Sequence, residues 1–411
     1  MKKTVADIDV SGKRVLVRVD FNVPQDDGGA ITDDSRIRSV LPTLRKLFDG
    51  NGRLIVMSHL GRPEGKDRAA DAVYSLKPVA TRLSEMLNRQ VPLAPDSIGP
   101  RVQAMAERLR NGDVLLLENL RFHKAEQIKD KDAAEDPELR KQKDDFARQI
   151  AALGEVYVNE AFGTCHRDNA SMLTVPQMMA GKPRVIGYLV QQELKFLGEV
   201  VAHPARPFVV VLGGAKVSDK LGVITALLER CDTVLIGGAM AYTFLAAEGM
   251  PVGRSLTEPE LFDQARQLRR QAGERLQLPV DSVAAAKIER NAPSQVCTDA
   301  IASDLMGLDI GPATIKKYQS LLMSARTIVW NGPMGVFETR PFDVGTRAIA
   351  RTMADATARG VVTIVGGGDS AAAVDEAGLS QRMTHVSTGG GASLEFLEGK
   401  WFPAIDVLDD K

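Results

Sequence analysis

A short apolar run that ends in two glycines and is followed by two lysines is the stretch of this chain best suited to hold a phosphate. Residues 208–220 read FVVVLGGAKVSDK. The run 208–212 predicts a buried strand, and the missing glycine side chains let backbone N–H groups approach an anionic ligand. The apolar spacing after Ser218 predicts a helix, whose N-terminus also favours anions. Lys216 and Lys220 add positive charge beside this turn, although a tight turn with solvated lysines is the alternative.

Further strand-like runs in the second half of the chain also end in glycine. They lead into residues 237–238, 331–335, 366–370 and 389–391. Glycine turns at strand ends, each feeding a helix, indicate backbone nests for a polyphosphate and a smooth wall for a nucleotide base. Asp369 follows one of these turns, where a carboxylate suits a hard cation such as Mg²⁺ carried on phosphates. As an alternative, Asp369 or Ser370 caps the next helix.

Strand-like runs in the first half of the chain end in polar or charged side chains. The runs are 15–19, 54–57, 114–117 and 156–158. Helical patterns lie between them, so we expect parallel βαβ units whose ligand binds beyond the carboxyl ends of the strands. That edge would collect the cationic side chains Arg36, Arg62, Arg121, Arg167, His59 and His166. Because arginine suits carboxylate and phosphate oxygens, this set points to a small, multiply anionic ligand. The alternative is that each arginine pairs with a surface carboxylate.

The order of strands and helices predicts an α/β fold with two Rossmann-like parallel-sheet domains. We expect residues 1–186 to form the first domain and residues 202–395 the second. The segment 187–201 carries apolar residues on one helical face, which predicts an interdomain helix. The C-terminal segment 396–411 is too short for a domain, and we expect it to return to the first one.

Composition excludes several classes of protein. The net charge of −1 over 411 residues argues against broad attraction to nucleic acid or membranes, so an anion site must be local. With only three cysteines and no apolar run of transmembrane length, we expect a cytoplasmic protein. Cys165 beside His166 lacks an evident third group, which indicates an unreactive thiol. The polar stretch 127–143 indicates a solvated excursion or a helix start and no site.

Together the two halves of the chain favour phosphoryl transfer. One half offers charged side chains for a compact anion. The other offers glycine turns, lysines and a metal carboxylate for a nucleotide. In such a reaction the protein mainly positions groups and neutralises charge, and a cleft that closes would also exclude water.

Motifs along essentially the whole chain resemble those of the phosphoglycerate kinase family. The matching stretches, in the family's order, are RVDFNVP (18–24), SRIRSVLPT (35–43), SHLGRP (58–63), ENLRFHK (118–124), NEAFGTCHR (159–167), LGGAKVSDK (212–220), GGAMAYTF (237–244), NGPMGVFE (331–338), GGGDS (366–370) and STGGGASLEFLEGK (387–400). The resemblance implies a glycolytic or gluconeogenic monomer that bends at a hinge. It would catalyse a reversible, Mg²⁺-dependent transfer, 1,3-bisphosphoglycerate + ADP = 3-phosphoglycerate + ATP. Residues 1–186 would bind the phosphoglycerate and residues 202–395 the nucleotide.

The resemblance also assigns roles to individual residues. The phosphoglycerate would be bound by Asp20, Asn22, Arg36, His59, Arg62, Arg121 and Arg167. The cations facing the phosphoryl group in transfer would be Arg36, Lys216 and Lys220. The nucleotide site would comprise Gly213, Lys216, Gly237, Gly238, Asn331, Pro333, Glu338 at the ribose, Gly367, Gly368, Asp369 as the Mg²⁺ contact, and Ser370. A carboxylate acceptor is already ionised near neutral pH, so this reaction needs no general base. His59 and His166 are therefore interpreted as binding or structural residues.

A few positions depart from the family pattern. Ser370 replaces a usual threonine but keeps a hydroxyl, and Cys165 stands where alanine is commoner. Asp168-Asn169 replaces a more typical Ala-His pair. Pairing of Asp168 with Arg167 would weaken the hold of that arginine on the substrate and raise KM.

Two other functions stay open. The arginines would equally suit a kinase that forms an acyl phosphate on another small acid, which a substrate panel separates. A non-catalytic sensor of a phosphorylated metabolite would not need Lys216 and Lys220 beside a metal carboxylate, and a turnover assay separates it. A dinucleotide-dependent dehydrogenase is disfavoured, because no strand is followed by GxGxxG with an acidic residue about twenty positions on.

Overall fold

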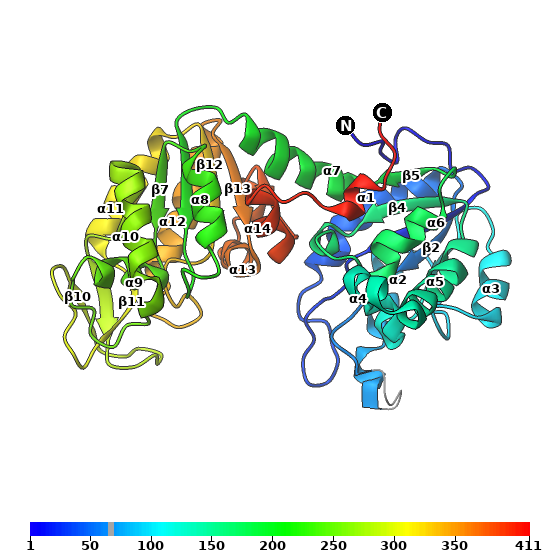
Figure 1. Ribbon diagram of the computed structural model, residues 1–411, viewed down its shortest axis with the longest axis horizontal. Helices are drawn as coiled ribbons and strands as arrows, with labels where there is room; N and C mark the ends of the chain where they lie inside the picture. The colour runs from blue at the N-terminus through cyan, green and yellow to red at the C-terminus, as the bar shows by residue number, and fades with distance from the viewer. Residues whose placement is uncertain (65–69) are drawn as a thin grey trace. The chain divides into compact units, whose positions relative to one another are not determined.

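The computed structural model describes residues 1–64 and 70–411, and the chain folds into two compact units. Unit 1 comprises Met1–Leu194 and Trp401–Lys411, and unit 2 comprises Lys195–Lys400. The division falls inside a helical segment formed by α7 (Tyr188–Glu193) and the π-helical η6 (Leu194–Val200). Each unit is built on a parallel sheet flanked by helices, so the predicted α/β fold class is confirmed (Figure 1).

The sheet of unit 1 consists of parallel strands in the order β3-β2-β1-β4-β5. Runs of Val, Leu and Ile are buried on both faces of these strands, as expected of a parallel sheet covered by helices. Because β1 is central, the chain segments that follow β1, β2 and β4 leave the sheet side by side. The strand bounds are β1 (Arg14–Val19), β2 (Arg53–Met57), β3 (Val114–Leu116), β4 (Val156–Glu160) and β5 (Arg184–Ile186).

Amphipathic helices cover this sheet. α1 buries Ile37, Val40, Leu44 and Leu47, which recur at helical spacing, in the core of the unit. The helices of unit 1 besides α7 are α1 (Ser35–Asp49), α2 (Lys77–Leu87), α3 (Pro100–Glu107), α4 (Asp130–Glu135), α5 (Pro137–Ala152), α6 (Val175–Met178) and α15 (Pro403–Asp406). The shorter turns are η1 (Ala70–Tyr74), η2 (Leu120–Phe122), η3 (Lys124–Gln127), η4 (Phe162–Thr164) and the π-helical η5 (Ala170–Thr174).

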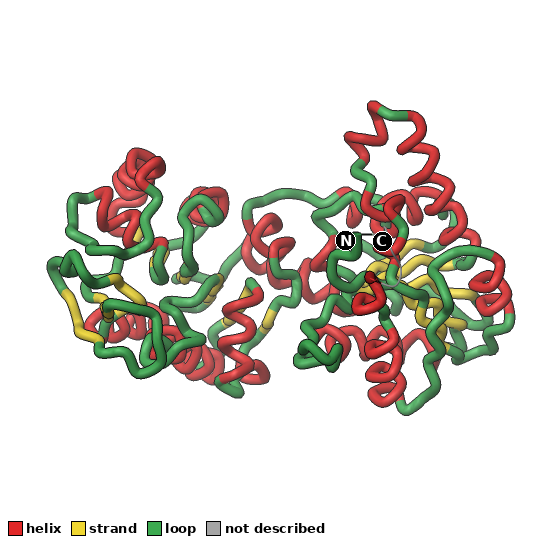
Figure 2. The backbone as a smooth tube through the Cα atoms, turned by 90° about the horizontal axis from the view of Figure 1, so that it is seen from below, coloured by secondary structure: helices red, strands yellow, loops and turns green. Residues whose placement is uncertain are grey.

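The C-terminal segment lies in unit 1 beside the N-terminus (Figure 2). The N–H of Lys411 donates to the carbonyl of Met1 at 2.9 Å, and Asp409 forms an ion pair with Arg184 of β5 at 3.0 Å. This return begins at Trp401 and not at the expected residue 396, because α14 (Gly391–Leu397) packs on α8 (Leu221–Leu228) within unit 2.

The main sheet of unit 2 is also parallel, in the order β14-β13-β12-β6-β7-β8. Its central pair is β12 and β6, and the core includes the fully buried indole of Trp330. The strand bounds are β6 (Phe208–Leu212), β7 (Thr233–Ile236), β8 (Leu276–Gln277), β12 (Thr327–Asn331), β13 (Val362–Gly366) and β14 (His385–Val386).

A second, antiparallel sheet in unit 2, β10-β9-β11, was not predicted from the sequence. Three of the four β10 residues are exposed, so this strand lacks the apolar pattern that marks the others. Its strands are β9 (Ser282–Ala285), β10 (Ser294–Cys297) and β11 (Met306–Ile310). The remaining helices of unit 2 are α9 (Met240–Ala247), α10 (Phe262–Ala272), α11 (Pro312–Ser324), α12 (Val344–Ala358) and α13 (Gly368–Glu376), with short turns η7 (Pro259–Leu261), η8 (Gly273–Arg275) and η9 (Ser380–Arg382).

Candidate functional site

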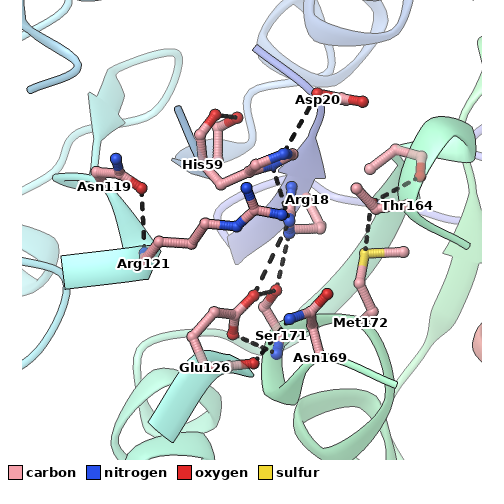
Figure 3. A network of polar contacts seen from close by, with 12 residues as sticks. Arg18, Asp20, His59, Asn119, Arg121, Glu126, Thr164, Asn169, Ser171 and Met172 are labelled. Carbon is pink, nitrogen blue, oxygen red and sulfur yellow. Dashed lines mark hydrogen bonds and ion pairs between the residues drawn. The ribbon is translucent and has the colours of Figure 1, made fainter. Parts of the chain in front are cut away.

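In unit 1, side chains at the carboxyl ends of β1, β2 and β3 form one polar network (Figure 3). Asp20 follows β1, and its Oδ2 lies 2.8 Å from Nη1 of Arg36, which comes from the first turn of α1. His59 follows β2, is 3% exposed and places Nε2 4.0 Å from Oδ1 of Asp20. Arg121 lies in η2 after β3 and donates from Nη1 to the carbonyl of Gly61 at 2.6 Å. These strand ends therefore gather the predicted residues as the parallel sheet requires.

Arg18 lies at the centre of this network, and reasoning from the sequence missed it. It belongs to β1 and is only 1% exposed. Its Nε donates to Oγ of Ser171 at 2.8 Å, and its Nη2 lies 3.4 Å from Nδ1 of His59 and 3.9 Å from Oε1 of Glu126. Glu126 also accepts from Oγ of Ser171 at 2.6 Å. An arginine inside an apolar strand was the available signal, because a buried charge requires partners.

Positive charge in this network is desolvated and closely spaced. Burial and the charges of Arg167 and Arg18 lower the pKa of Arg121 to about 10. Figure 3 shows the guanidinium of Arg121 extending toward Arg18. Burial also holds the pKa of His59 well below its usual value, and the neighbouring arginines add to this effect although Asp20 opposes it. His59 is therefore neutral near pH 7, and the arginines supply the positive charge.

Asp20 stays ionised in this setting. Burial disfavours its charged form, but the surrounding positive groups outweigh burial and lower the pKa of Asp20 below its usual value. Its carboxylate thus offsets part of the positive charge and fixes Arg36, while the cations still outnumber the carboxylates.

Three more predicted residues lie around this network. Oδ1 of Asn22 accepts from the N–H of Gly61 at 2.7 Å, which ties the loops after β1 and β2 together. Arg167 is exposed, and its charge is among those that lower the pKa of Arg121. Arg62 is exposed, and within residues 1–64 and 70–411 its side chain has no hydrogen bond or ion pair.

Asp168 does not pair with Arg167 in the described part of the chain, contrary to expectation. Its Oδ2 accepts from the N–H of Asp130 at 2.6 Å. Nζ of Lys143 donates to the carbonyl of Asp168 at 2.6 Å and to Oδ1 of Asp130 at 2.9 Å. The polar stretch 127–143, interpreted from the sequence as a solvated excursion or a helix start, contains α4 and the start of α5 and reaches the loop that carries Arg167.

In unit 2, four parallel strands end level with one another. Leu212 of β6 lies opposite Ile236 of β7 and Asn331 of β12, and Asn331 lies opposite Gly366 of β13. The glycine turns that follow these strands therefore adjoin at one edge of the sheet, as the sequence predicts.

Most of these glycines allow the turns to pack on one another. Their N–H groups donate at 2.8–3.0 Å to carbonyl groups of adjacent segments: Gly213 to Asn331, Gly214 to Pro333, Gly237 to Leu212 and Gly238 to Met334. A Cβ on Gly213 would overlap the carbonyl oxygen of Pro333. These N–H groups are not free to hold a phosphate, so the nest interpretation fails at these glycines. They still offer a smooth wall.

Unlike the packed glycine turns, the start of α13 has backbone N–H groups suited to bind an anion. Gly367 precedes the helix with φ of +91°, a conformation that favours glycine. The first N–H groups of a helix have no partner within it, so this end suits an anion. Gly368 and the predicted metal contact Asp369 are exposed in the first turn. Ser370 is buried, and its Oγ accepts from the N–H of Gly332 at 2.6 Å, so its hydroxyl fastens α13 to the loop after β12.

Lys220 is the buried cation of unit 2's site. Its Nζ contacts Oδ1 of Asn331, and burial lowers the pKa of Lys220 to about 8, although Asp369 opposes the shift. Nδ2 of Asn331 is buried with no hydrogen-bond partner in the described residues, and so keeps a free donor. Lys216 and Glu338 are exposed.

Comparison with known proteins decides the family. The family model for phosphoglycerate kinase matches residues 5–400. Phosphoglycerate kinase of Chlorobaculum tepidum is 52% identical over 413 residues and covers 100% of both chains. The chain belongs to the phosphoglycerate kinase family. The family's member from Rhodopirellula baltica is 51% identical over 412 residues, covering 100% of this chain and 99% of its own.

Solved structures of the phosphoglycerate kinase family share the fold. The structure from Coxiella burnetii has a TM-score of 0.83 at 39% identity and covers 99% of this chain and 98% of its own. The structure from Pyrococcus horikoshii has a TM-score of 0.84 at 31% identity, with coverage of 98% and 97%. The resemblance seen in the motifs is thus confirmed, and the protein is a phosphotransferase with a carboxyl group as acceptor.

Two further expectations concern the thiol of Cys165 and membrane-spanning segments. Cys165 is fully buried, and burial raises the pKa of its thiol to about 12, so the thiol is protonated and inert. All three cysteines are free. In the ranges the structure describes, none of the helices has the length and apolar character needed to cross a membrane.

Proposed function

We propose that the protein catalyses the reversible, Mg²⁺-dependent transfer 1,3-bisphosphoglycerate + ADP = 3-phosphoglycerate + ATP, a step of glycolysis and gluconeogenesis. Family membership supports this reaction. The observation that carries the proposal is the desolvated network around Arg18, Arg36 and Arg121, in which cations outnumber carboxylates. Such a site suits a small ligand with several negative charges, since the ligand relieves the repulsion.

The phosphoglycerate is assigned to unit 1. Arg36, held by Asp20, and Arg121, held by the carbonyl of Gly61, would bind its anionic oxygens. Asn22, His59, Arg62 and Arg167 would complete the site. Arg18 is too deeply buried to lie at the surface of the site, so its role is to hold the network together.

The nucleotide is assigned to unit 2. The first turn of α13 would hold phosphate oxygens with Lys216, Lys220 and Nδ2 of Asn331. The packed turns would form the wall for the base, and Glu338 would meet the ribose. The residues of that wall are Gly213, Gly237, Gly238 and Pro333.

Magnesium fits the donors that this site offers. Asp369 is an exposed carboxylate at the phosphate-binding turn. Mg²⁺ is commonly bound through one or two carboxylates, with waters and substrate phosphates as its other ligands. In the described residues, no group of three or more His, Cys, Asp or Glu could hold a metal ion. When bound at Asp369, the ion would neutralise phosphate charge.

The chain's own residues then act by position and charge. The acceptor carboxylate is ionised near neutral pH, so no side chain has to remove a proton. Arg36, Lys216 and Lys220 would stabilise the charge on the phosphoryl group as it moves in line between the two ligands. We also propose that the enzyme bends at a hinge and encloses the two ligands, which would exclude water. A cytoplasmic location and a monomeric state stay predictions.

A coupled assay of ATP consumption that depends on 3-phosphoglycerate and Mg²⁺ tests the function. We expect robust turnover of the wild type and a fall in kcat of about a hundredfold in Lys220→Ala and in Arg36→Ala, because charge stabilisation of the transition state is lost. Arg38→Ala, an exposed neighbour on α1, is the matched control and keeps its rate. Turnover only with a different carboxylic acid would reject the assigned substrate. Binding of both ligands without turnover would favour a sensor.

A further inference from the structure

We propose that Lys143 is a positioning residue, which acts from α5 to fix the loop that presents Arg167 to the phosphoglycerate. The inference rests on the function proposed above and names a new residue that supports its substrate site.

Lys143 is buried although it lies in the mostly polar first half of α5. Its side chain is 0% exposed, and it falls one turn before Phe146 and two turns before Ile150 on the inner face of α5. A fully buried ammonium group needs partners, because desolvation of an unpaired charge is costly. Lys143 has two, the carbonyl of Asp168 at 2.6 Å and Oδ1 of Asp130 at 2.9 Å.

Asp130 closes a triangle with these groups. Its N–H donates to Oδ2 of Asp168 at 2.6 Å, and its carboxylate also accepts from Arg140 at 3.3 Å. Residue 168 is therefore held twice, at its carbonyl by Lys143 and at its carboxylate by Asp130. The carboxylate of Asp168 is directed to the N–H of Asp130 and forms no ion pair with Arg167 in the described residues.

The residue on the other side of Asp168 is also fixed. Nδ2 of Asn169 donates to the carbonyl of Glu126 at 3.0 Å, and Figure 3 shows Asn169 next to Glu126 at the lower edge of the network. Arg167 itself is exposed, and its Nε donates to Nε2 of the adjacent His166 at 3.2 Å, a contact within the same loop. Its placement therefore depends on the backbone that Lys143 and Asp130 hold.

The test compares Lys143→Met with Lys141→Met, an exposed lysine on the same helix. Methionine keeps the length of the stem and removes the donor. We expect Lys143→Met to raise KM for 3-phosphoglycerate about tenfold, the size of one lost charge-assisted hydrogen bond. KM for ATP and kcat stay unchanged, and Lys141→Met behaves as wild type. A purely structural role would instead lower the active fraction and the melting temperature at constant KM.

A double-mutant cycle with Arg167→Ala tests whether Lys143 affects substrate binding through Arg167. If Lys143 acts through Arg167, then Lys143→Met costs nothing further in the Arg167→Ala background. Asp130→Pro removes both the N–H that bonds the carboxylate of Asp168 and the carboxylate that bonds Lys143, so it should also raise KM for 3-phosphoglycerate. Asp130 is the first residue of α4, a position that accepts proline. This variant decides the question if Lys143→Met fails to fold.

Several outcomes would overturn the inference. An unchanged KM for 3-phosphoglycerate in folded Lys143→Met or Asp130→Pro rejects it, and so does a full effect in the Arg167→Ala background. Calorimetric titration with 3-phosphoglycerate separates this failure from that of the proposed function. If the wild type binds 3-phosphoglycerate but does not turn over, the proposed reaction is rejected. If Lys143→Met then binds 3-phosphoglycerate more weakly than the wild type, the positioning role still holds. Absence of 3-phosphoglycerate binding to the wild type rejects both.

Discussion

The anion sites proposed for the two units are built in different ways. Unit 1 buries charged side chains, such as Arg18 and Arg121, at the ends of its strands. Unit 2 brings glycine turns into contact and uses their N–H groups to hold the turns together, so the anion site proposed for it lies at the start of α13. The first site should therefore be most sensitive to the removal of a charge. The second should be most sensitive to a side-chain carbon added at one of the packed glycines.

The largest effect should come from removing a buried charge in unit 1. Arg18→Met leaves the carboxylate of Glu126 buried without its cation, which should lower the free energy of unfolding by about 3–5 kcal/mol. Urea unfolding measures this free energy. The control is Arg148→Met, because the side chain of Arg148 is 66% exposed. Arg18→Met combined with Glu126→Gln should recover part of the loss. A loss in Arg18→Met no larger than that of the control would show that this network does not hold unit 1.

A smaller effect should follow from adding a methyl group in unit 2. Gly213→Ala places a Cβ against the carbonyl of Pro333, and overpacking of this kind costs about 1–3 kcal/mol. Gly368→Ala is the matched control, since its Cβ would meet nothing within 4 Å. Thermal unfolding should therefore separate the two variants, with Gly213→Ala less stable. Equal stability would mean that the turns are not packed as described.

The smallest effect concerns Lys220, the buried cation that unit 2 does have. Its pKa of about 8 in the folded chain lies below the ordinary 10.5 of lysine. The ammonium form, which the proposed chemistry needs, is therefore lost as pH rises through about 8, and kcat/KM for the nucleotide should fall there. Lys220→Arg keeps its charge and should not show this fall. A pH–rate profile that is flat to pH 10 in the wild type would contradict the assignment.

The same shift has a consequence for stability with the opposite sign. Between about pH 8 and 10.5 the unfolded chain holds more protons on Lys220 than the folded chain does. The contribution of this group to the free energy of unfolding therefore rises with pH over that window, while activity falls.

Much of the fold and part of the site followed from local pattern. Apolar runs ending in charge or glycine located β1 to β4, β6, β7, β12 and β13, because strands buried on both faces consist mostly of apolar residues. Asp20, Arg36, His59 and Arg121 were correctly expected at one edge, since parallel strands end together. These inferences needed only neighbours in sequence.

The rest depended on partners far along the chain. The N–H of Gly214 bonds to the carbonyl of Pro333, and no local pattern shows that a turn will be used this way. The sequence suggested that Asp168 pairs with the adjacent Arg167. In the structure, its carboxylate instead accepts a hydrogen bond from the N–H of Asp130. The burial of Lys143 was predictable, because Lys143 lies at helical spacing from the buried Phe146 and Ile150. Its charge instead favoured a solvent-exposed position.

The return of the C-terminus gives this protein an unusual order of assembly during translation. The chain leaves unit 1 at Leu194 and re-enters it at Trp401. The returning segment supplies Asp409 to Arg184 and the carbonyl of Ala404 to Nδ2 of Asn159 at 3.3 Å. Domains commonly fold in the order in which the ribosome makes them. Here all of unit 2 is synthesised before residues 401–411 of unit 1 emerge. Unit 1 therefore cannot complete its fold until unit 2 has been made.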